Sequence, residues 1–483
     1  MNIDFFKSNI DLSFILISII FYLIVMYFFQ VDIIGYWESV SVYSSLEPGS
    51  SPIFGNIQIA ADTTGGHGID YPLILLSQYF AKIFTLSFSS LKYIFLIYST
   101  VFLIFYYYAI KYITNSSIAF FSLLLLIINP YFLYMNTMLI SQTFTLALVF
   151  LNILLFIKFE KKKSLTIFFM LSISISLLLM NYILGRYILL ITILYFFIRA
   201  IKQNSFSKQI IIQNIFSYSK LVLLSLFILI VIFPPNLGIL FSKNLFLPVS
   251  ALQQGGETIL YESRILEIIF ANIKHIINTY FLSPISNNDF NIINSEPSNF
   301  FPLASTLFFL FGFFIAFKKR VLILFNLIFL NLVILIVLSN SVVEEGNLTS
   351  TSISVYRMYM LVPIMVIFIS YGIQEISNYL FKNLKYNQIF KLSIMIILII
   401  FNFQKIIKSD KHFNQIKNSY FLENDIMKKF LDKQDKNYEY RLALDYHIKI
   451  KSLSNKLINL IENKDIDTQY IYLNIDTNLV FLK

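Results

Sequence analysis

The chain has 483 residues, of which 57% are hydrophobic and only 13% are charged. Soluble proteins of this length carry about a quarter charged residues, so the composition indicates a membrane protein and excludes an ordinary soluble enzyme. The net charge of +10 is expected in cytoplasmic loops and does not indicate nucleic-acid binding.

Apolar runs recur along most of the chain, and a membrane span needs about 20 mostly apolar residues. Eleven runs lie at 13–29, 93–112, 117–134, 139–158, 165–180, 182–198, 220–235, 301–317, 321–338, 355–380 and 391–403. The first run should remain as an anchor, because MNIDFFKSNIDLSF lacks the basic region and the cleavage site of a signal peptide. A weaker run at 72–88 begins with a proline and contains Gln78 and Lys82, which favours a helix on the membrane surface.

Basic residues predict the orientation, because positive loops stay on the cytoplasmic side. They cluster at 161–163, at 199–208, at 318–320 and at 382–385. All four clusters fall inside only if 72–88 does not cross the membrane and the N-terminus is cytoplasmic. The outer loops are then 30–92, 236–300 and 339–355.

These elements predict an all-α polytopic membrane protein with a transmembrane domain over 1–403, built from about 11 helices. Juxtamembrane helices are expected on its outer face, one of them in ETILYESRILEIIFANIKHI, where apolar residues recur at helical spacing. The tail, 404–483, predicts a small extracytoplasmic α+β appendage, because YEYRLALDYHIKI and TQYIYLNI alternate as half-buried strands do.

The first outer loop begins with VDIIGYWE, directly after an apolar run. Asp32 in this stretch is either a charge that marks the end of a span or a carboxylate base held at the membrane surface. Glu47 and Asp62, further along the loop, are expected to be ordinary solvated residues. GGHGIDYP then leads into the surface helix, and its glycines permit tight backbone turns.

Arginines and a histidine are the other polar candidates. Arg357, in SVYRMYMLVP, either snorkels to lipid headgroups or binds an anionic ligand. Arg186, in MNYILGRYILL, lies nearer the apolar region, where ionisable residues often mark function, although snorkelling remains an alternative. Arg264 and His275 belong to the second outer loop, and His275 is expected at the surface.

Several kinds of chemistry lack their motifs. The four histidines show no zinc-ligand spacing, and no glycine-rich loop indicates ATP hydrolysis. The absence of cysteine excludes disulfides and thiol catalysis.

Taken together, these features resemble the membrane-embedded glycosyltransferases with the C-type (GT-C) fold, in particular the branch of protein O-mannosyltransferases and lipid A aminoarabinose transferases. The resemblance rests on an acidic residue after the first span, a long outer loop, and Asp70-Tyr71-Pro72 opening a surface helix. INPYFLYMNTMLISQTFTLAL is similar to the hairpin between the third and fourth spans, and VYRMYMLVP to an Arg-Tyr-Leu-x-x-Pro segment. The resemblance covers roughly residues 10–400.

The resemblance implies transfer of a sugar from a polyprenyl-phosphate donor to an extracytoplasmic glycan, lipid or protein of the cell envelope. Asp32 is then the catalytic base, and Arg357, together with Arg186, binds the donor phosphate. The implied substrate-binding residues are Tyr36, Trp37, Asp70, Tyr71 and Gln142. The chemistry requires no metal, although a divalent ion is compatible with it, and the partners are the lipid bilayer, donor and acceptor.

The chain departs from the family pattern in two places. Ile33 occupies the position of a second acidic residue that often follows the catalytic one, so a tandem pair is absent. Gln142 stands near the start of the fourth span, where an acidic residue is common in the family.

Two other functions remain open at this point. An O-antigen polymerase or ligase would also be polytopic in the inner or plasma membrane, with Arg264 and His275 as its functional residues. A lipid or sugar translocase would instead need polar residues lining the middle of the bundle.

Overall fold

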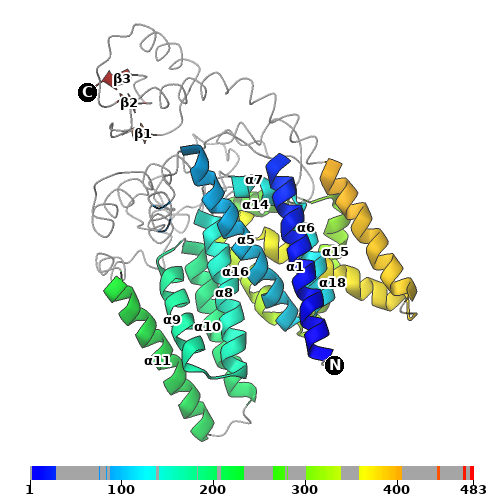
Figure 1. The fold of residues 1–483 in the computed structure, drawn as a ribbon, viewed down its shortest axis with the longest axis horizontal. Helices are drawn as coiled ribbons and strands as arrows, with labels where there is room; N and C mark the ends of the chain where they lie inside the picture. The colour runs from blue at the N-terminus through cyan, green and yellow to red at the C-terminus, as the bar shows by residue number, and fades with distance from the viewer. Residues whose placement is uncertain are drawn as a thin grey trace.

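The computed structural model of the chain is a bundle of helices (Figure 1). The residues that it describes are 3–28, 76, 83, 88–137, 141–181, 183–203, 208–232, 265–277, 280, 301–338, 358–383, 385–404, 443–445, 471–474 and 479–482. Within these residues there are 13 helices.

The bounds of the helices are α1 Ile3–Phe28, α5 Phe88–Ile113, α6 Ser116–Ile127, α7 Pro130–Thr137, α8 Ser141–Lys161, α9 Leu165–Leu179, α10 Ile183–Gln203, α11 Lys208–Ile232, α14 Ile265–Ile277, α15 Leu303–Lys319, α16 Ile323–Leu338, α18 Val362–Leu380 and an unlabelled helix Lys385–Gln404. Short connections join the helices from α5 to α11, and longer stretches of chain separate several of the others.

Among the described helices, five are long and apolar enough to cross a membrane. Their apolar segments are Leu96–Ile113, Gln142–Lys161, Leu184–Lys202, Ile212–Leu229 and Lys385–Gln404. This set identifies a multi-pass membrane protein. Each of the eleven predicted apolar runs coincides at least in part with a described helix, whereas most of the predicted surface helix at 72–88 lies outside the described residues.

One predicted span is wrong as a single helix. The run 117–134 is divided between α6, which ends at Ile127, and α7, which begins at Pro130. Proline has no backbone N–H and disfavours helical geometry in the residue before it, so the helix stops here despite continuous hydrophobicity. The side chain of Asn129 then accepts a hydrogen bond of 3.0 Å from the Phe132 N–H and caps the start of α7.

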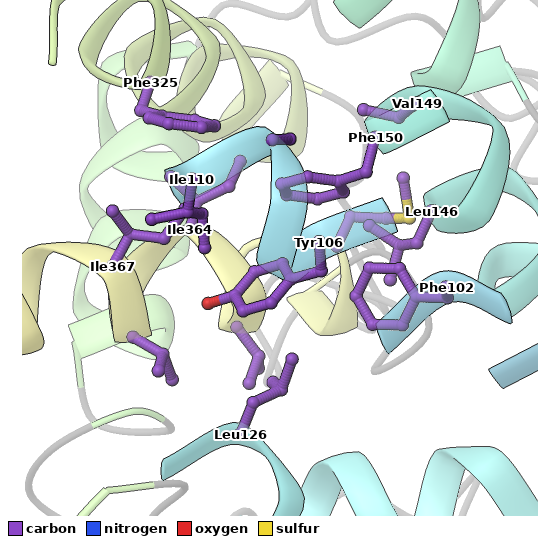
Figure 2. Close-up of a cluster of buried hydrophobic side chains, with 14 of the residues drawn as sticks. Phe102, Tyr106, Ile110, Leu126, Leu146, Val149, Phe150, Phe325, Ile364 and Ile367 are labelled. Carbon is purple, nitrogen blue, oxygen red and sulfur yellow. The ribbon is translucent and has the colours of Figure 1, made fainter. Parts of the chain in front are cut away.

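The centre of the bundle is an aromatic and aliphatic cluster between α5, α6, α8, α16 and α18 (Figure 2). Tyr106 lies fully buried there, with its ring centroid 5.0 Å from that of Phe150. Its hydroxyl donates to the carbonyl oxygen of Pro363 at 2.9 Å, which satisfies the one polar atom of this side chain and ties α5 to α18.

The bundle has two chemically different ends. We call one end the basic end: it carries the last residues of α8, α10, α15 and α18 and the first residues of the helices that follow them. We call the other the α7 end: it carries α7, α14 and the first turns of α8, α10 and α18. At the basic end, carboxylates pair with basic residues from other helices. The ion pairs are Asp11–Lys111, Glu160–Arg199 and Glu375–Lys319.

The described residues of the C-terminal tail form three short strands. They are β1 Ala443–Asp445, β2 Ile471–Asn474 and β3 Leu479–Leu482, and they form one sheet in the order β1-β2-β3. β1 pairs with β2 in parallel, and β2 pairs with β3 antiparallel. β1 and β2 fall within the two segments where the alternation of apolar residues predicts strands, whereas the domain organisation of the tail remains a prediction.

Candidate functional site

Most residues that the sequence singles out lie outside the described part of the chain. These are Asp32, Tyr36, Trp37, Asp70, Tyr71, Arg264 and Arg357. His275 belongs to α14 by its backbone, and its side chain is not described. Gln142 and Arg186 are described completely, and the site is therefore built from these two and from the described neighbours of the others.

Gln142 and Arg186 occupy the starts of two adjacent helices at the α7 end. Gln142 is the second residue of α8, and Arg186 is the fourth residue of α10. The two helices meet where Gly185 lies against Thr145, so closely that a methyl group on Gly185 would come within 2.6 Å of the Thr145 methyl. Arg186 directly follows this contact, and Gln142 precedes it by one turn.

Both side chains are buried. Arg186 is 2% exposed and Gln142 is 7% exposed. A snorkelling arginine would have an exposed side chain, so snorkelling to the headgroups does not describe Arg186. A buried guanidinium in a membrane helix is costly and is retained where it faces the bundle interior. The structure therefore places a positive charge inside the α7 end.

Tyr359 connects three segments at this end. It follows Arg357 by two residues and is fully buried. Its hydroxyl donates to the side-chain oxygen of Asn136 on α7 at 3.5 Å, and Thr143 of α8 lies near the same hydroxyl. Its ring stacks on Phe132 of α7 with centroids 6.1 Å apart. The chain directly after Arg357 is thus fixed against α7 and against the start of α8.

Tyr280 fixes the same segment from another direction. Its fully buried hydroxyl donates to the carbonyl oxygen of Met358, the residue immediately after Arg357. Its own carbonyl accepts a hydrogen bond of 3.0 Å from the Phe301 N–H, just before α15. The start of α18 is therefore tied to the chain that follows α14 and to the chain that precedes α15.

The last turns of α1 reach the same region. Tyr22 packs against Phe132 of α7 with ring centroids 6.2 Å apart, and its hydroxyl donates to Ser99 of α5 at 2.8 Å. Asp32 follows the end of α1, at Phe28, by four residues. At about 3.5 Å per residue, the Cα atoms of Phe28 and Asp32 are at most about 14 Å apart.

Sequence reasoning missed the residues that join these segments, namely Asn136, Tyr359 and Tyr280. The only local signal for Asn136 was its place in the hairpin after the Asn129–Pro130 pair. Tyrosines are frequent in this chain, so nothing distinguished Tyr280 or Tyr359 among 31 of them. Their partners lie 78 and 223 residues away in the chain, which no local pattern can indicate.

Several polar side chains are buried at the α7 end. They comprise the guanidinium of Arg186, the amides of Gln142 and Asn136, and the hydroxyls of Thr143 and Tyr359. Guanidinium groups bind phosphate well, and amides and hydroxyls suit sugar hydroxyls. Within the described residues, no group of three or more His, Cys, Asp or Glu side chains is placed to hold a metal ion.

No known protein-family model matches the chain, and no curated protein matches it either. The interpretation of the site therefore rests on the residues of the chain and on their geometry.

Proposed function

We propose that the protein is a membrane glycosyltransferase that moves a sugar from a polyprenyl-phosphate donor to an acceptor outside the cytoplasm. The observation that carries the proposal is the contact of Tyr359 with α7 and α8. It fixes the chain next to Arg357 beside the chain next to Gln142, and α1, which precedes Asp32 in the sequence, packs against α7 through Tyr22. Segments adjacent to three of the residues that the resemblance groups into one site therefore meet at the α7 end, which supports the proposal.

The proposed reaction has one bond-forming step. Asp32 accepts the proton of an acceptor hydroxyl as its oxygen attacks the anomeric carbon. The bond between that carbon and the donor phosphate oxygen breaks, and its electron pair leaves with the polyprenyl phosphate. Arg357 and Arg186 stabilise the charge that grows on this phosphate. A lipid-linked donor explains why the site belongs to the end of a membrane bundle.

In this proposal the bundle has the C-type arrangement, with about 11 spans. The α7 end is extracytoplasmic and the basic end is cytoplasmic, as the distribution of lysine and arginine favours. α14 is then one of the juxtamembrane helices of the outer face. Its apolar residues recur at helical spacing, as is typical of a helix that lies along the membrane surface.

The decisive experiment compares Asp32→Asn with wild type in a deletion strain of the native host, at matched membrane abundance. Asparagine keeps the size of the side chain and removes the carboxylate base. The matched control is Asp62→Asn in the same outer loop, where the carboxylate is expected to be solvated. Mass spectrometry of lipid extracts and of envelope glycans gives the readout.

If the proposal holds, the deletion strain and Asp32→Asn accumulate a polyprenyl-phosphate sugar and lose one envelope modification, whereas Asp62→Asn behaves as wild type. The mass of the accumulated lipid then gives the class of the sugar, such as hexose or pentose. Wild-type glycans and lipids in the Asp32→Asn strain would refute Asp32 as the base. Loss of function in Arg264→Gln or His275→Gln instead would indicate the polymerase or ligase alternative.

A further inference from the structure

A second site lies at the basic end, in the connection between α8 and α9. Lys161, Lys162 and Lys163 are consecutive, and all three side chains are exposed. The proposed sugar transfer does not use them, and the rule that places positive loops in the cytoplasm explains their side of the membrane but not their detailed placement.

Neutral groups hold two of these ammonium groups in place. The Lys161 Nζ lies 4.9 Å from the centre of the Tyr112 ring, at the end of α5. The Lys163 Nζ donates to the side-chain oxygen of Asn214 on α11 at 3.4 Å. A ring and an amide position a cation without cancelling its charge.

The carboxylate nearest to these lysines in the sequence forms an ion pair with another residue. Glu160 pairs with Arg199 of α10, with 3.5 Å between Nε and the carboxylate oxygen. This contrasts with Lys111 and Lys319 at the same end, each of which is paired with a carboxylate of another helix. Among the described residues no carboxylate forms an ion pair with these three lysines, which therefore present a concentrated positive charge.

An apolar strip begins directly beside this charge. Leu165, Phe169 and Ile173 recur every four residues on α9, and they are 71%, 45% and 44% exposed. The strip is about 12 Å long at 1.5 Å per residue, which is close to the depth of one leaflet, about 15 Å of hydrocarbon. Exposed apolar residues at this spacing on a helix of a membrane bundle face lipid chains.

We propose that Lys161–Lys163 and the adjoining strip of α9 bind an anionic phospholipid. Its phosphate lies between the fixed ammonium groups, and its acyl chains lie along Leu165, Phe169 and Ile173. A nucleic acid or an acidic protein would neutralise the charge of the lysines but would not cover the apolar strip. A zwitterionic lipid would cover the strip but would bring no net negative charge. This binding is independent of the proposed sugar transfer.

The test is lipid retention by the full-length protein, purified in detergent and examined by native mass spectrometry. The probes are phosphatidylglycerol and, as the neutral reference, phosphatidylcholine with the same acyl chains. The variant Lys161→Gln/Lys162→Gln/Lys163→Gln removes the charge. Lys161→Arg/Lys162→Arg/Lys163→Arg keeps it, and Lys318→Gln/Lys382→Gln/Lys385→Gln removes three exposed charges elsewhere at the basic end.

Wild type, the arginine variant and the distant control should retain phosphatidylglycerol more tightly than phosphatidylcholine. The triple glutamine variant at 161–163 should bind phosphatidylglycerol roughly 100-fold more weakly, given the usual attraction of anionic membranes for three lysines. Equal retention by this variant and wild type would overturn the proposal. An equal loss in the distant control, or equal retention of the two lipids by wild type, would overturn it as well.

Discussion

The stability of the protein should depend on the crossing of α15 and α18, because two glycines there bring the helix backbones into contact. A methyl group on Gly312 would lie 2.0 Å from the carbonyl oxygen of Phe368, and one on Gly372 would lie 2.1 Å from that of Phe308. Backbone atoms cannot rotate away as a side chain can. Since a carbon and an oxygen in contact are about 3.3 Å apart, Gly312→Ala must part the helices by about 1.3 Å.

Separation of α15 and α18 would loosen the aromatic packing around their crossing. Phe313 of α15 lies 5.3 Å from Phe368 of α18 and 5.4 Å from Phe329 of α16, measured between ring centroids. Overpacking costs up to about 3 kcal/mol, and alanine recovers up to about 1 kcal/mol of helix propensity. We therefore expect Gly312→Ala and Gly372→Ala each to lower the free energy of unfolding by about 2 kcal/mol.

The assay is denaturation of the purified protein in detergent by increasing amounts of SDS, followed by circular dichroism. Gly185→Ala is the control, because its new methyl group would meet the side chains of Thr145 and Leu178, and we expect a cost below about 1 kcal/mol. The double variant Gly312→Ala/Gly372→Ala should cost less than the two single losses added, since one separation of the helices accommodates both methyl groups. Wild-type stability of Gly312→Ala would refute this reasoning.

Three further substitutions test buried polar contacts with the same denaturation assay. Asp11→Ala leaves Lys111 without its carboxylate and should lower the free energy of unfolding by about 2–3 kcal/mol. The double variant Asp11→Ala/Lys111→Ala should recover part of this loss. If the losses of the two single variants add fully, the ion pair does not contribute to stability. Tyr280→Phe removes the hydroxyl bound to the Met358 carbonyl and should cost about 1 kcal/mol, with faster hydrogen exchange confined to the start of α18. Asn152→Leu removes hydrogen bonds between α8 and α9 and should cost about 0.6–1.7 kcal/mol, so a neutral effect would mean that they contribute nothing.

Hydropathy was sufficient to locate the helices, because burial in lipid requires long apolar runs with internally satisfied backbones. It was insufficient for helix bounds. α1 begins at Ile3 and α11 at Lys208, whereas the apolar runs begin at 13 and 220. Polar residues extend a helix where they can reach partners beyond the apolar region, as Asn214 of α11 does with the Ala200 carbonyl at 3.3 Å. For α1 and α11 the apolar run therefore gives only the minimum length of the helix.

Contacts between distant segments are what the sequence could not provide. Asp11 and Lys111 are 100 residues apart, and Gly312 and Gly372 are 60 residues apart, so no periodicity relates them. For the candidate site, the sequence indicated Gln142 and Arg186 by type and position. It did not indicate that α8 and α10 meet beside them, because Gly185 and Thr145 are far apart in the sequence and no local pattern relates them.

The break between α6 and α7 involves both features that the sequence could not predict, namely a helix bound and a contact between distant segments. A continuous helix through 117–134 would carry Asn136 about 13 Å beyond Ile127 along the same axis, at 1.5 Å per residue. The Asn129–Pro130 pair instead ends α6 and starts α7, whose Phe132 ring and Asn136 side chain both contact Tyr359. Pro130 hardly changes the hydropathy of this run. The helix break that it causes nevertheless brings together the segments of the proposed site. Because proline acts through its missing N–H and its ring, Pro130→Ala should permit helix to extend through position 129 and should displace Asn136 from Tyr359.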